Sequence, residues 1–109
     1  MAHAVLLPFV EAYRVVADVL ARQAIGDPLS EKDCVQKSLA YGRQAYLQRR
    51  ISSEASIGRL LFSNAYRLMD NLELIDAEGD DLAERRLQLA QSFRGLQRRI
   101  ERVRAAALP

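Results

Sequence analysis

The chain has 109 residues, of which half are hydrophobic and 28% are charged, and it contains one cysteine, Cys34. This length and composition predict a single folded domain and exclude a disordered chain. The longest apolar run, residues 4–7, is too short to span a bilayer, and the start lacks the basic and apolar blocks of a secretory signal. A lone cysteine rules out an internal disulfide and fits a reducing compartment.

The net charge of +2 conceals an asymmetry along the chain. Residues 1–81 contain nine Lys or Arg against twelve Asp or Glu, whereas residues 82–109 contain seven Arg against two Glu. The basic end therefore requires its own interpretation.

A first helix is expected to begin near Leu7, because Pro8 suits a first helical turn, and residues 26–28 (G-D-P) should end the helix or its fraying tail. Its apolar residues form a row and a flank at helical spacing: Leu6, Phe9, Val10, Tyr13, Val16, Ala17 and Leu20, with Ala12, Val15 and Val19. So wide an apolar surface fits either a central helix covered by the other three or a helix that also docks on something outside this chain. In the second case the contact residues would be Phe9, Tyr13, Val16 and Leu20.

A second helix is expected after the break at residues 26–28 (G-D-P), with Ser30 as its N-cap and an end near Arg49. Its inward residues would be Cys34, Val35, Ser38, Leu39, Gly42, Ala45 and Tyr46. A glycine inside a helix costs about 1 kcal/mol relative to alanine. Close approach of a neighbouring helix at Gly42 would explain why that cost is tolerated.

A third helix is expected from a cap at Ser52 or Ser53 to Asn71 or Leu72. Its apolar row would contain Ile57, Leu60, Leu61, Asn64, Ala65, Leu68, Met69 and Leu72. The acidic stretch 76–81 (D-A-E-G-D-D) is expected to be a loop. It lacks the ligand spacing of a calcium loop, so we predict no metal site there.

The last helix is expected from Leu82 to about Ala107, with a heptad row of Leu89, Phe93, Leu96, Ile100, Val103 and Ala107. Arginines crowd its other faces, and Arg94, Arg98, Arg99 and Arg102 are the candidate basic face. The expected fold is all-α: an antiparallel bundle of four helices with short loops, forming one domain over residues 1–109.

The sequence contains no pattern of catalytic residues. Cysteine and histidine occur once each and far apart, and the glycines are scattered, so no zinc site, catalytic triad or phosphate loop is expected. We predict no catalytic residue, cofactor or metal, and interpret Cys34 as an ordinary, partly buried thiol. Arg49 and Arg50 either complement the dipole at the end of the second helix or bind a ligand.

The basic face of the last helix has three interpretations. It is a solvated surface, a surface that meets anionic lipid headgroups, or a binding site for nucleic acid or an acidic protein. Nucleic acid is the least favoured partner, because the face lacks the aromatic side chains that readers of bases usually add.

Four segments resemble the C-terminal region of bacterial glycerol-3-phosphate acyltransferases of the actinobacterial type. They are P-F-V-E-A-Y-R-V-V-A-D-V-L (8–20), Y-L-Q-R-R-I-S-S-E-A-S (46–56), L-L-F-S-N-A-Y-R-L (60–68) and L-A-E-R-R-L-Q-L-A (82–90). The resemblance covers nearly the whole chain in register.

This resemblance implies an enzyme that transfers a fatty acyl group from acyl-CoA or acyl carrier protein to the sn-1 hydroxyl of glycerol 3-phosphate. The family's His-x-x-x-x-Asp signature would lie in an upstream acyltransferase domain of the same polypeptide. Here the residue five positions after His3 is Pro8, so that signature is absent. The chain would then be a non-catalytic C-terminal module that packs on the catalytic domain.

The parent enzyme would sit peripherally on the cytoplasmic side of the cell membrane, and the fragment itself would be soluble. We also expect the isolated fragment to self-associate through the apolar surface of its first helix. The alternative is a free-standing helical adaptor that binds an acidic protein or nucleic acid through its arginine-rich last helix.

Overall fold

The computed structural model describes the backbone of residues 2–51, 57–75 and 81–107, and the side chains of residues 8–51, 57–75 and 81–103. It contains four helices: α1 (Ala2–Arg22), α2 (Glu31–Leu47), α3 (Arg59–Asn71) and α4 (Leu82–Ala107). No strand occurs in these ranges, which confirms the all-α class. The connections span residues 23–30, 48–58 and 72–81 and are longer than the short loops expected for a simple bundle.

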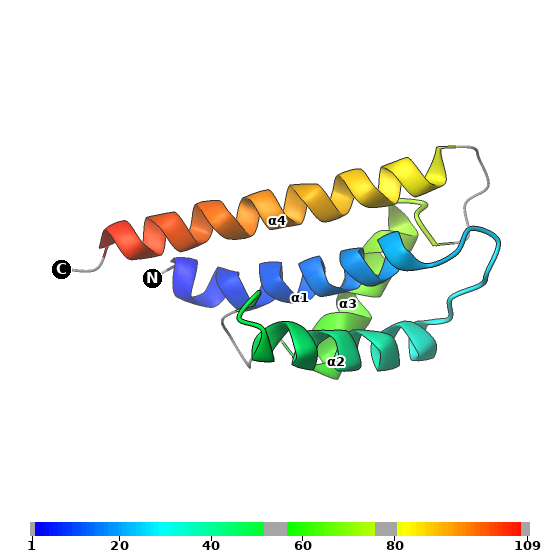
Figure 1. Ribbon diagram of the computed structural model, residues 1–109, viewed down its shortest axis with the longest axis horizontal. Coiled ribbons are helices and arrows are strands. Elements are labelled where there is room, and N and C mark those ends of the chain that lie inside the picture. The colour runs from blue at the N-terminus through cyan, green and yellow to red at the C-terminus, as the bar shows by residue number, and fades with distance from the viewer. Residues whose placement is uncertain (1, 52–56, 76–80, 108–109) are drawn as a thin grey trace.

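The arrangement centres on α1 (Figure 1). The helices α2 and α4 lie on either side of α1 and run in the opposite direction, while α3 crosses obliquely behind (Figure 1). Within the described ranges, α4 packs against α1 and makes no comparable contact with α2 or α3. Because α3 crosses α1 obliquely, the arrangement is not the simple antiparallel bundle of four helices that was expected (Figure 1).

Central placement explains the unusually apolar sequence of α1. Every side chain from Val15 to Leu20 is buried, because α2, α3 and α4 together surround this helix. The interpretation of a central helix is thus supported by the packing. Glu11 and Asp18, which look like surface positions in the sequence, are 0% and 1% exposed.

Three expected helix boundaries are wrong. Helix α1 begins at Ala2, with Pro8 inside it, because one proline removes a single backbone donor without ending the helix. Helix α2 ends at Leu47, because the chain turns at Arg49, whose φ is 60°. Helix α3 begins only at Arg59, with the extended Gly58 as its N-cap. The capping expected of Ser52 or Ser53 lies outside the described residues.

Two of the local expectations at α2 are confirmed and one is wrong. Ser30 caps the helix, with its hydroxyl oxygen accepting a hydrogen bond from the Asp33 backbone N–H at 3.2 Å. A Cβ built on Gly42 would lie 3.3 Å from Cζ of Phe62, so the glycine does permit the close approach of α3. Tyr46 was expected to face inward but is 38% exposed.

The inward faces of α3 and α4 are rotated from those expected. In α3 the buried residues are Phe62, Ala65 and Met69, whereas Leu60 is 73% exposed. In α4 the buried positions are Leu82, Arg86, Ala90, Gln97 and Ile100, and two members of the expected heptad row, Leu96 and Val103, are exposed. The side chain of Ala107, the last member of that row, lies outside the described residues. In α4 the error arises because two polar residues, Arg86 and Gln97, occupy inward positions.

Candidate functional site

The basic face of α4 divides into one paired arginine and three exposed ones. Arg94 binds the buried carboxylate of Asp18, with its Nη2 and Nε atoms 2.7 and 3.1 Å from Oδ1. Arg98, Arg99 and Arg102 are exposed and make no ion pair among the described residues. Arg94 is therefore a structural contact, and only the other three remain available to an external partner.

The candidate contact residues of α1 are also divided by burial. Val16 and Leu20 are 0% and 1% exposed within this chain's own core. Tyr13 is half-buried and packs edge-on against Phe93, with ring centroids 5.8 Å apart. Phe9 is 43% exposed. Of the four, Val16 and Leu20 are occupied by internal packing, so any contact through α1 would depend on Phe9. The interface itself stays a prediction.

The main polar feature of the interior is a set of linked side chains that we call the Asp18 cluster; its members are Glu11, Arg14, Asp18, Tyr41, Arg50, Arg94 and Gln97. The hydroxyl of Tyr41 donates a hydrogen bond to Oδ2 of Asp18 at 2.9 Å, and Arg14 lies 3.6 Å from the same oxygen. Arg94 occupies the other oxygen. Both carboxylate oxygens therefore have partners, which suits the joining of helices better than the abstraction of a substrate proton.

The same cluster also forms hydrogen bonds with the chain segment that follows α2. The backbone carbonyl of Arg50 accepts hydrogen bonds from Nη1 of Arg14 at 2.8 Å and from the Gln97 amide at 3.0 Å. The Gln97 amide nitrogen also lies 3.2 Å from a carboxylate oxygen of the buried Glu11. Side chains of α1 and α4 thus bind the first part of the connection between α2 and α3.

Tyr41 links the Asp18 cluster to two arginines. The guanidinium carbons of Arg22 and Arg50 lie 4.8 and 5.1 Å from the centre of its ring, which are cation–π distances. Arg50 Nη1 also donates a hydrogen bond to the Tyr41 hydroxyl at 3.1 Å. Burial, followed by the hydrogen bond to the Asp18 carboxylate, raises the pKa of Tyr41. Arg50 therefore contacts Tyr41 as part of the fold, in addition to any interaction with the dipole at the end of α2.

A buried arginine of α4, Arg86, binds the segment that follows α3. Arg86 is 4% exposed, and its guanidinium donates hydrogen bonds to the carbonyls of Leu74 at 2.8 Å and Ile75 at 3.0 Å. The sequence pattern had assigned Arg86 to the solvated faces of the last helix. It is instead part of the interior, where it satisfies backbone acceptors after α3.

Cys34 is an ordinary thiol, as the sequence predicts, and is more completely buried than expected. It is fully buried, and its sulfur lies 3.9 Å from the hydroxyl oxygen of Ser38. Burial raises the pKa of the thiol from 9.0 to about 11, so the thiolate is suppressed at neutral pH. In the ranges that the structure describes, no three His, Cys, Asp or Glu side chains gather to form a metal site.

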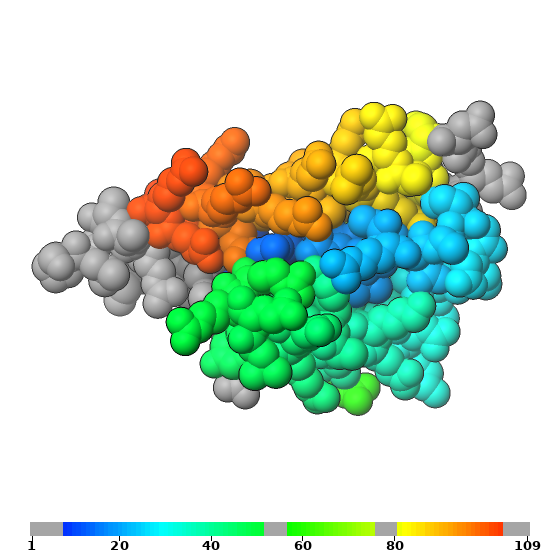
Figure 2. All heavy atoms as spheres, viewed as in Figure 1, coloured from blue at the N-terminus to red at the C-terminus, as the bar shows by residue number. Residues whose placement is uncertain are grey.

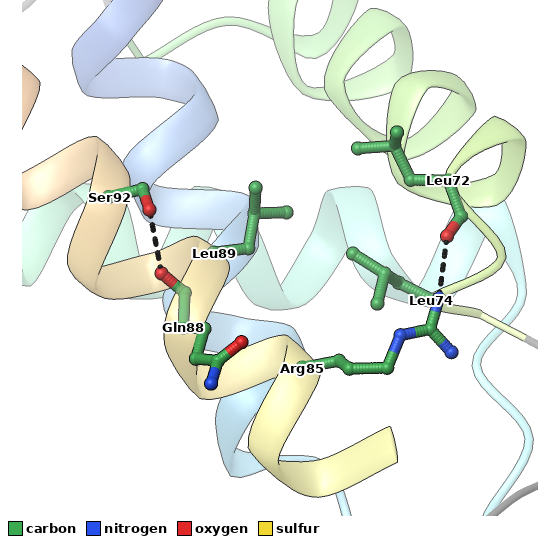
Figure 3. A pocket seen from close by; sticks show the side chains of 6 residues that line it. All are labelled: Leu72, Leu74, Arg85, Gln88, Leu89 and Ser92. Atoms are coloured by element: carbon green, nitrogen blue, oxygen red, sulfur yellow. Dashed lines mark hydrogen bonds between the residues drawn. The ribbon is translucent and has the colours of Figure 1, made fainter. Parts of the chain in front are cut away.

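An open hollow of about 300 Å³ lies where the end of α3 meets the first half of α4 (Figure 3). Its lining residues are Leu72, Leu74, Arg85, Gln88, Leu89 and Ser92. Leu74 and Leu89 lie on opposite sides of the hollow, and the side chain of Arg85 reaches across to the Leu72 carbonyl at 3.1 Å (Figure 3). It contains no nucleophile paired with a base, so its chemistry is that of a contact surface.

Sequence reasoning missed the Asp18 cluster, although a signal was present. Glu11, Arg14 and Asp18 recur at helical spacing on one side of an otherwise apolar helix. Arg94 and Gln97 recur at matching spacing on α4. Two such polar rows on helices that pack together indicate a buried polar seam rather than two solvated surfaces.

Comparison with known proteins gives a consistent result. Residues 1–78 match the family model for the glycerol-3-phosphate acyltransferase C-terminal region. Proteins named "Putative acyltransferase plsB1" from Mycobacterium bovis and Mycobacterium tuberculosis are 39% identical over 104 residues, which is 94% of this chain. The chain spans only 17% of the length of these relatives. No solved structure matches significantly.

Two further findings bear on this family. None of the described helices is both long enough and apolar enough to cross a bilayer. The resemblance noted in the sequence is confirmed by the family match, which covers well over half of the chain, and by the identity to the mycobacterial proteins. The chain belongs to the glycerol-3-phosphate acyltransferase C-terminal region family.

Proposed function

We propose that this chain is the non-catalytic C-terminal helical domain of a glycerol-3-phosphate 1-O-acyltransferase and packs on the catalytic domain of the same polypeptide. The observation that carries the proposal is the family match over residues 1–78. Its extension to a larger enzyme is supported by relatives of which this chain spans only 17%.

The proposed parent transfers an acyl group from acyl-CoA or acyl carrier protein to the sn-1 hydroxyl of glycerol 3-phosphate. Its His-x-x-x-x-Asp histidine would act as general base, with the aspartate orienting it, in a domain outside this chain. The residues described here would contribute rigidity instead, because the Asp18 cluster and Arg86 fix the helices around α1 through buried polar contacts.

The exposed arginines of α4 support a finer proposal, that this domain faces the anionic cytoplasmic side of a membrane. Arg98 and Arg102 are exposed one turn apart on the same side of α4. A basic residue near an anionic surface contributes about 1 kcal/mol. These two residues would favour peripheral binding to vesicles containing phosphatidylserine over neutral vesicles, and replacing both with glutamine should reduce that difference in a co-sedimentation assay.

The test of the main proposal is a chimera. In the Mycobacterium tuberculosis relative, the segment that matches this chain is replaced by this chain, and acyl transfer from acyl-CoA to glycerol 3-phosphate is measured. We expect the chimera to be active, the relative truncated of that segment to be inactive, and the 109-residue chain alone to be inactive. Acyl transfer by the isolated chain, or full activity of the truncated relative, would contradict the proposal.

A further inference from the structure

The outer side of α4 carries an apolar row that begins at the edge of the core, at Leu89, and continues into exposed positions at Leu96 and Val103. Leu89, Leu96 and Val103 recur every seven residues, which places them along one side of a helix. Leu96 is 38% exposed and Val103 is 57% exposed, while Leu89 is half-buried at the edge of the hollow. This row is half of the heptad pattern of α4. The other half, which includes Phe93 and Ile100, packs towards α1.

A second row runs parallel to the first. Arg85, Ser92 and Arg99 also recur every seven residues, and Arg85 and Ser92 line the same hollow as Leu89. We call the two rows together the outer strip of α4, defined by Arg85, Leu89, Ser92, Leu96, Arg99 and Val103. At 1.5 Å per residue the strip is about 27 Å long, the length of a helix of several turns. Figure 2 shows α4, coloured yellow to red, forming one long edge of the molecule.

Gly95 gives an independent indication that something approaches this side. A glycine in the middle of a helix costs about 1 kcal/mol relative to alanine. A Cβ built on Gly95 would meet no atom within 4 Å, so no contact among the described residues requires a glycine there. Gly95 follows Ser92 by three residues, and these two small residues together would let another helix lie close to the α4 backbone.

Charge distinguishes between the candidate partners. The strip carries Arg85 and Arg99 and no carboxylate. If two copies of this chain paired antiparallel through their strips about Ser92, Arg85 of one copy would lie opposite Arg99 of the other. That juxtaposition of like charges disfavours a second copy and favours a partner whose apolar face is bordered by carboxylates.

We propose that the outer strip of α4 is the surface that docks on the acyltransferase domain, by receiving a helix of that domain that is apolar on one side and flanked by carboxylates. This inference rests on the proposed function and replaces α1 by α4 as the contact element. It is consistent with the position of α1, whose residues Val16 and Leu20 are already buried by this chain. Most of the length of the mycobacterial relatives lies outside the matched segment and could supply the helix.

Thiol accessibility in the chimera tests this surface. L96C is introduced into the chain, alone and within the chimera, and maleimide labelling of the peptide containing it is timed by mass spectrometry. Covalent linkage gives an effective concentration in the millimolar range, so a docked strip should slow labelling by at least about tenfold relative to the isolated chain. The matched control is L47C, at an 80% exposed leucine on α2, which should be labelled equally fast in both contexts.

Two matched charge reversals test whether the partner helix carries carboxylates. R99E lies on the strip and R98E lies on another side of the same helix, and both positions are exposed. In the chimera, R99E should restore fast labelling of L96C, because it places a carboxylate against the partner's carboxylates. R98E should leave labelling slow. G95A should also speed labelling, because its added methyl group would hold the partner helix away.

The outcomes separate this inference from the proposed function. Equal labelling of L96C in an active chimera and in the isolated chain overturns the docking surface and leaves the proposed function standing. An inactive chimera with rapid labelling contradicts both. In the isolated chain, labelling of L96C could instead be slow and become slower as the protein concentration is raised. That result would identify a second copy as the occupant and overturn the inference.

Discussion

The Asp18 cluster should contribute a large part of the fold's stability, and replacing Asp18 with alanine tests this. The carboxylate is 1% exposed and accepts two hydrogen bonds from Arg94 and one from Tyr41. Removing one partner of a buried ion pair typically costs 3–5 kcal/mol, roughly, because the other charge is left uncompensated. The side chain of Arg94 is 35% exposed and regains some water, so we expect about 3 kcal/mol.

The assay for Asp18→Ala is urea unfolding followed by helical circular dichroism. A loss of about 3 kcal/mol would lower the melting temperature of a domain this size by more than about 10 °C. Asp70→Ala is the matched control, since Asp70 is exposed on α3, and it should change the unfolding free energy by less than about 0.5 kcal/mol. Equal unfolding free energies for the two variants would refute the assignment of Asp18 as a buried structural contact.

Three further predictions concern single sites. Because burial raises the pKa of Cys34 to about 11, the folded state holds this proton more tightly than the unfolded state, so stability should fall as the pH rises from 9 to 11; Cys34→Ala should flatten that part of the denaturation profile. Arg49→Gly should stabilise the chain by about 1 kcal/mol in urea unfolding, because φ is 60° there, whereas Arg43→Gly inside α2 should destabilise it by a similar amount. Gly42→Ala should lower the melting temperature, because the added Cβ would press on the buried Phe62 ring; an increase would show that the ring can move aside.

The features that follow from local sequence chemistry were predictable. The all-α class, the existence of four helices, the Ser30 cap and the close approach at Gly42 all depend on capping residues, glycine placement and helical spacing. Helix ends were less predictable. Arg49 continues the helical pattern in the sequence, but the chain leaves the helix there because the Arg50 backbone N–H bonds to the Ala45 carbonyl at 2.8 Å in a terminal turn.

The candidate site could not be predicted by sorting residues into apolar and polar. That rule places Glu11, Asp18 and Arg86 in solvent, whereas each is less than 5% exposed because another segment of the chain supplies its partners. The hydrogen-bond donors of Asp18 lie far away in the sequence, at Tyr41 and Arg94. Spacing within one helix can mark a row of polar residues, but it does not say which residues of another helix pair with that row, so the pairings become visible only when the helices are assembled.

These buried polar contacts also explain the orientation of α4. A rotation that buried Leu96 and Val103 against α1 would increase the apolar area removed from water, by about 1.5–3 kcal/mol for each side chain fully buried. The same rotation would withdraw Arg94 and Gln97 from Asp18 and Glu11 and leave two carboxylates without these partners inside the bundle. Breaking one buried pair costs roughly 3–5 kcal/mol, which is comparable to the whole gain from burying both side chains, and the rotation would break more than one such contact. The Asp18 cluster therefore fixes which side of α4 faces inward and leaves the outer strip of α4 available to a partner.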